Sequence, residues 1–196
     1  MVVLSLCTAA AADFTGLSGS CGQSDDGNYL VYQIYANFDD ASDITLSVYN
    51  ANSNPTGGFN HSDGGGGMWL PFFSTLGGDT SIDSYVNLNA VDSSPVGAFG
   101  AVNLDPNFGS GMGDSIPANA GWYYSPTLAP VQGTMIHLGQ FVLGDGADFT
   151  IGLTVGWKRD GTTETFGSEG SYTTVPTPGA LALLGLGGLV ARRRRA

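Results

Sequence analysis

The sequence predicts an all-β protein: a single antiparallel β-sandwich domain, jelly-roll-like, followed by a short hydrophobic helix at the C-terminus. Glycine accounts for 31 of the 196 residues and charged residues for only 12%, which is typical of short strands joined by polar turns. Between residues 13 and 172 no segment keeps the 3.6-residue periodicity of an amphipathic helix. Several segments instead alternate apolar and polar residues, which indicates strands with one face in a core.

The alternation is clearest in residues 29–38, where the five even-numbered residues are all apolar or aromatic. Residues 43–49 alternate in the same way, and we expect Ile44, Leu46 and Val48 to point inward. Because only four residues connect these segments, we expect them to form a hairpin. Further strands are predicted at residues 84–88, 98–104, 121–124, 134–143, 149–157 and 162–166. Seven or eight short strands are typical of a sandwich with two packed layers.

The first twelve residues predict a secretory signal peptide. An apolar start leads into a run of small residues, and cleavage is expected in the region of Ala10, Ala11 and Ala12, which leaves a β domain over residues 13–174. No Lys or Arg precedes Lys158, so either the translation start lies upstream or the signal is unusual. The alternative is a first buried strand. If Cys7 leaves with the signal, Cys21 is the one cysteine of the mature chain.

The last 22 residues have three parts. Pro176 and Pro178 end any preceding strand, residues 180–191 are apolar, and a basic cluster follows, which consists of Arg192, Arg193, Arg194 and Arg195. An apolar run this short is often a core helix, and arginine-rich ends can bind nucleic acid or stay solvated. The run has no polar face, however, which favours a lipid environment, and the arginines would stay on the cytoplasmic side of a membrane. The tail therefore indicates membrane attachment or sorting.

These residues carry a family resemblance. Residues 175–196 resemble a PEP-CTERM sorting signal, with Pro176, Thr177, Pro178 and Gly179 at the motif and threonine where the family usually has glutamate. The resemblance implies that an exosortase-type membrane enzyme processes the tail. It also implies export to the cell envelope, the cell surface or the extracellular space, with a transient or stable C-terminal membrane anchor. It covers about a tenth of the chain and implies no activity for the rest.

The acidity of the domain excludes some partners. Residues 13–175 hold all 17 acidic residues and only two basic ones, a net charge of −15, which argues against nucleic acid and anionic lipid. Such a surface favours solubility and cations. Two short acidic turns supply hard oxygen ligands of the kind that Ca²⁺ prefers. The candidate ligands are Asp25, Asp26, Asp39, Asp40 and Asp43. Both segments are also typical of ordinary turns, so we assign no metal site to them.

No catalytic constellation is visible in the sequence, so we expect no enzyme. His61 and His137 are the two histidines, with no pair at zinc-ligand spacing, and no Gly-x-Ser-x-Gly nucleophile motif occurs. Residues 50–71 are expected to form a long loop, a common place for binding residues. The tryptophans are expected at the edge of the core, and Trp69 and Trp122 are alternatively candidates for stacking on sugar rings.

The function expected from the sequence is that of an exported cell-envelope or matrix protein of structural or interaction type, with exopolysaccharide as a possible partner. The alternative is a secreted carbohydrate-binding module or a polysaccharide-active enzyme.

Overall fold

The computed structural model describes residues 13–61, 69–70, 79–90, 102–108, 114–124 and 130–174. This part of the chain is all-β with antiparallel sheets, as the composition predicted. The signal peptide expected at residues 1–12 and the sorting tail expected at residues 175–196 lie outside the described residues, and so does the C-terminal helix. Among the residues described, no helix is long and apolar enough to cross a membrane.

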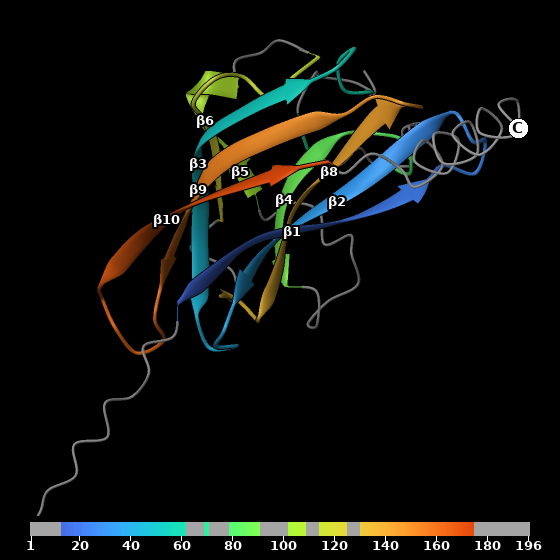
Figure 1. Ribbon diagram of the computed structural model, residues 1–196. Coiled ribbons are helices and arrows are strands. Elements are labelled where there is room, and N and C mark those ends of the chain that lie inside the picture. Colours follow the sequence, from blue (N-terminus) through green and yellow to red (C-terminus); the bar gives the residue numbers. More distant parts are fainter. Residues whose placement is uncertain are drawn as a thin grey trace, which may run out of the picture.

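The strands form two sheets, drawn as two layers in Figure 1. The four-stranded sheet has the order β1-β2-β8-β4, and the six-stranded sheet has the order β10-β9-β3-β6-β5 with β7 also paired to β3. A 3₁₀ turn, η2, spans Pro106–Phe108. The strand bounds are β1 Phe14–Gln23, β2 Tyr29–Phe38, β3 Ile44–Pro55, β4 Tyr85–Ala90, β5 Val102–Leu104, β6 Ala120–Tyr124, β7 Val131–Gln132, β8 Met135–Gly144, β9 Phe149–Lys158 and β10 Thr165–Thr173.

The core lies between the two sheets, which makes the arrangement sandwich-like. The even-numbered residues of β2 are all buried, as their alternation predicted, and the odd-numbered residues of β9 are buried opposite them. Aromatic rings meet edge-on across the layers, with ring centroids 5.3 Å apart for Tyr32 and Phe149 and 5.7 Å apart for Phe38 and Trp157. Burial of these large rings between the layers stabilises the fold.

The predicted hairpin between residues 29–38 and 43–49 is wrong. β2 pairs with β1 and β8 in one sheet, whereas β3 pairs with β6, β7 and β9 in the other. Packed sheets lie about 10 Å apart, a distance that a four-residue connection spans, so a short loop can change layers as readily as it can turn back. The chain crosses between the sheets at this point, and Asp43 is buried at the crossing with 1% exposure.

Leu46 also departs from the expected pattern. The pairing of β3 with β9 shifts register between Thr45 and Ser47, so Leu46 occupies a β-bulge and is only half-buried. An extra residue in one strand breaks the inward-outward alternation locally. Ile44 and Val48, on either side of the bulge, are buried as expected.

Candidate functional site

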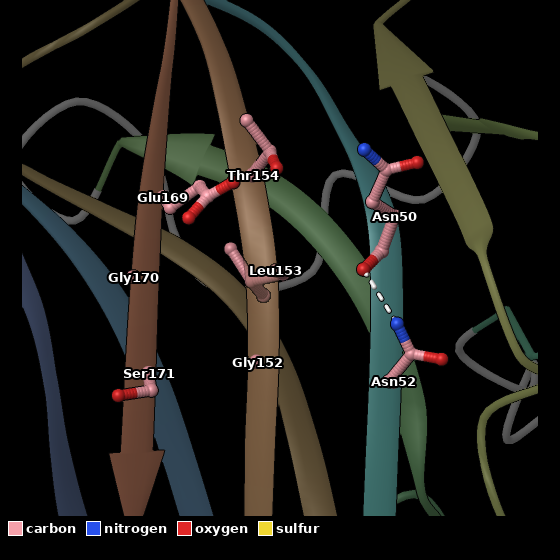
Figure 2. A pocket seen from close by; sticks show the side chains of 8 residues that line it. All are labelled: Asn50, Asn52, Gly152, Leu153, Thr154, Glu169, Gly170 and Ser171. Atoms are coloured by element: carbon pink, nitrogen blue, oxygen red, sulfur yellow. Dashed lines mark hydrogen bonds between the residues drawn. The ribbon is translucent and has the colours of Figure 1, made fainter.

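An open polar cleft lies on the outer face of the six-stranded sheet, away from the core. Its volume is about 540 Å³. Strands β3, β9 and β10 run side by side beneath it, and Figure 2 shows the residues that line it. They are Asn50, Asn52, Gly152, Leu153, Thr154, Glu169, Gly170 and Ser171. The sequence analysis named none of the eight as site residues. It placed Asn50 and Asn52 in a loop and left most of β10 unassigned, and although it predicted the strand that holds residues 152–154, nothing in that strand pointed to a site.

A second β-bulge in β3 presents the two asparagines on this face. Tyr49 pairs with Thr154 and Asn52 pairs with Gly152, so two residues of β3 oppose one residue of β9 between these pairs. Asn50 absorbs the bulge with a positive φ of 52°, a conformation that asparagine tolerates better than most residues. β-Bulges often re-aim side chains beside functional sites. Here the bulge places Tyr49, Asn50 and Asn52 together at the outer surface.

The amide of Asn52 is held in place by the surrounding backbone. Its Nδ2 donates a hydrogen bond to the carbonyl oxygen of Asn50 at 2.9 Å, the dashed line in Figure 2. Its Oδ1 accepts a hydrogen bond from the backbone N–H of Asn119 at 3.3 Å. An amide side chain has two donor hydrogens and two acceptor positions. Asn52 therefore retains one donor and one acceptor that are already oriented when a ligand arrives.

Glycine forms the floor of the cleft. Gly152 lies between Asn52 on β3 and Ser171 on β10, and a Cβ atom built on it would meet nothing within 4 Å. The missing side chain is therefore what leaves this part of the strand surface hollow. Next along the strands, Thr154 pairs with Glu169, which places one hydroxyl beside the one charged side chain of the lining.

Tyr49 flanks the cleft and lies along the sheet surface. A Cβ atom at Gly156 would come 3.4 Å from its Cε1 atom, and one at Gly167 would overlap its hydroxyl oxygen. The ring therefore extends across β9 to β10, over two positions that lack side chains. It remains 39% exposed, and Tyr123 on β6 is 45% exposed on the same face of the sheet. Part of the Tyr49 side chain is therefore open to solvent beside the cleft.

The two predicted sugar-stacking tryptophans are wrong for that role, because both are buried. Trp69 is 1% exposed and stacks on His61, with ring centroids 4.8 Å apart. Trp122 is fully buried, and its Nε1 donates a hydrogen bond to the carbonyl oxygen of Asn87 at 2.9 Å. Both rings belong to the core, close to the core-edge position that the sequence analysis expected, and among the described residues the exposed aromatic rings on the cleft side of the sheet are tyrosines.

The five candidate calcium ligands fall at opposite ends of β2. Asp25 and Asp26 lie in the turn before the strand, and Asp39, Asp40 and Asp43 lie beyond it. A ten-residue strand is about 30 Å long, so the two groups cannot share an ion.

Hydrogen bonds within the turns use two of these carboxylates. Asp26 accepts hydrogen bonds from the Ser24 hydroxyl and from Asn28. Asp40 accepts hydrogen bonds from the backbone N–H and the hydroxyl of Ser42. These bonds lower the pKa of both carboxyl groups. The described residues contain no group of three or more His, Cys, Asp or Glu that could hold a metal ion.

The histidines lie away from the cleft. His61 places Nδ1 2.8 Å from the carbonyl oxygen of Ser84 and 3.3 Å from Oδ1 of Asp83. His137 is a buried residue of β8, the strand position that the sequence predicted, and burial lowers its pKa to about 4. Cys21 is exposed on β1 and is not in a disulfide. None of these three side chains lines the cleft.

Comparison with protein-family models and with curated proteins found no match for this chain.

Proposed function

We propose that this is an exported cell-envelope or extracellular-matrix protein of the interaction type, sorted through its PEP-CTERM-like tail. In this proposal the β domain is a jelly-roll-like sandwich that binds a partner through the outer face of its six-stranded sheet. The tail, with its motif at Pro176–Pro178 and its four arginines, holds the chain at the membrane through a short hydrophobic helix until an exosortase-type enzyme acts.

The polar cleft is the observation that carries the interaction role. It combines the oriented amide of Asn52 with the amide of Asn50, hydroxyls and a flanking tyrosine on an open sheet surface, and these groups can form hydrogen bonds and pack against a ligand. The export role rests on the sequence of the two chain ends and on the acidity of the domain, which keeps an exported protein dispersed.

Replacing the four terminal arginines tests the sorting role. With serine at Arg192, Arg193, Arg194 and Arg195, the tail loses the charges that resist translocation, each of which also contributes on the order of 1 kcal/mol at an anionic membrane surface. We expect the membrane-bound precursor to fall sharply in fractionated cells of the organism that encodes the protein. The matched control replaces the same residues with lysine, which keeps the charge and should keep the precursor. Equal precursor in the serine variant and the parent chain would reject the proposal.

A further inference from the structure

We infer that the cleft on the six-stranded sheet binds a neutral polysaccharide chain, with Asn50, Asn52 and Ser171 as hydrogen-bonding residues and Tyr49 as a stacking platform. This inference rests on the proposed function, because it names the partner class of the same surface. It follows from the chemistry of the lining, the charge of the domain and the position of the tyrosine.

The lining matches a hydroxyl-rich ligand. A sugar hydroxyl both donates and accepts hydrogen bonds, and so do the exposed amides of Asn50 and Asn52 and the exposed hydroxyl of Ser171. The amide of Asn52 is already fixed by its bonds to Asn50 and Asn119, so less conformational entropy is lost when a ligand binds. An apolar ligand would leave these polar groups without partners, which costs affinity.

The charge of the surface selects against anionic polysaccharides. Glu169 is the charged residue of the lining, and it lies in a domain with a net charge of −15. A uronate, sulfate or phosphate group would meet this negative field, both on approach and in the cleft. A neutral chain meets no such repulsion, and a carboxylate such as Glu169 is a strong acceptor for its hydroxyls.

The tyrosine supplies the apolar part of the site. A sugar ring presents axial C–H groups on one face, and these pack against an aromatic ring that lies parallel to the sugar. Tyr49 lies over Gly156 and Gly167, is 39% exposed, and pairs with Thr154 of the polar lining. The cleft volume of about 540 Å³ falls within the range of roughly 300–1,000 Å³ found for ligand sites. Because the cleft lies on an open sheet face, it can bind a segment of a longer polysaccharide chain.

The test uses native gels that contain a soluble polysaccharide, through which the purified full chain migrates. The neutral probes are a soluble β-glucan, xylan and galactomannan, and the anionic probes are alginate and polygalacturonate. The decisive variant is Gly152→Phe, which fills the floor of the cleft at a strand position with open space above it. The matched control is Gly22→Phe on β1, where a Cβ atom also meets nothing within 4 Å.

We expect at least one neutral probe to retard the parent chain and neither anionic probe to do so. Gly152→Phe should weaken binding by at least about 10-fold, a change of about 1.4 kcal/mol, and Gly22→Phe should bind as the parent does. The inference is overturned if the folded parent chain binds none of the neutral probes, if alginate binds as tightly as they do, or if Gly152→Phe binds unchanged. If the chain is exported and sorted to the membrane but binds none of the neutral probes, the proposed sorting role stands and only the polysaccharide inference is rejected.

Discussion

Replacing Gly167 with alanine tests how Tyr49 lies on the sheet. The new methyl group would overlap the tyrosine hydroxyl, so the ring must swing aside. Tyr49 is 39% exposed, so about 120 Å² of a side chain of roughly 200 Å² is covered. At about 25 cal/mol per Å² this contact stabilises the fold by at most about 3 kcal/mol. Losing half of it costs about 1.5 kcal/mol, whereas alanine in a strand gains about 0.5–1 kcal/mol over glycine.

We therefore expect Gly167→Ala to lower the free energy of unfolding by about 0.5–1 kcal/mol. In a Tyr49→Ala background there is no ring to displace, so the same substitution should raise the free energy of unfolding by about 0.5–1 kcal/mol. Urea denaturation of the four proteins, followed by tryptophan fluorescence, gives the coupling energy between the two sites. The same stability change in both backgrounds would refute the position of the ring across β10.

Three further predictions concern the core, the layer crossing and the cleft floor. Trp157→Ala should lower the free energy of unfolding by about 3–5 kcal/mol in urea, because Trp157 stacks on Phe166 and packs against the opposite sheet; a loss below about 1 kcal/mol would contradict the packing. Burial, with Asp40 and Asp39 nearby, raises the pKa of Asp43, so its stabilising contribution is complete below its ordinary pKa of 3.8 and is lost as pH rises through the folded value. Asp43→Asn should therefore be more stable than the parent at pH 7 and match it near pH 3 in thermal melts; equal melting temperatures at both pH values would reject the raised pKa. Gly152→Val should raise the free energy of unfolding by about 0.5–1 kcal/mol, because it adds a β-branched residue in open space; destabilisation would mean that the floor is not hollow.

Strands with regular alternation could be predicted from the sequence, and strands without it could not. β2 begins and ends where the pattern predicted, and β9 ends within one residue of its predicted bound. β1 was missed because Gly16, Gly19 and Gly22 interrupt its apolar residues. Packing accounts for the glycine at position 19, because a Cβ atom at Gly19 would lie 2.6 Å from the ring of Tyr172 on β10. Such close contacts between distant segments leave no periodic signal.

The cleft could not be predicted because tertiary structure creates it. Asn50 and Asn52 stand in a stretch rich in asparagine and serine that reads as a loop, but pairing with β9 extends β3 through it to Pro55. The hollow depends on which glycines face outward on neighbouring strands, and that follows from register and bulges. In β10 exposed and half-buried residues alternate strictly in the structure, but of the half-buried residues only Phe166 and Tyr172 are apolar, so the sequence carried little signal.

An NMR titration tests the central claim of a carbohydrate-binding cleft most directly. A soluble neutral oligosaccharide cut from the polysaccharide that retards the chain is added to the ¹⁵N-labelled protein, and amide shifts are mapped onto the two sheets. We predict saturable shifts centred on Asn50, Asn52, Gly152 and Ser171, with none on β1 or β2. Saturable shifts centred on the four-stranded sheet, or no shifts at a concentration that retards the protein in gels, would contradict the assignment of the cleft.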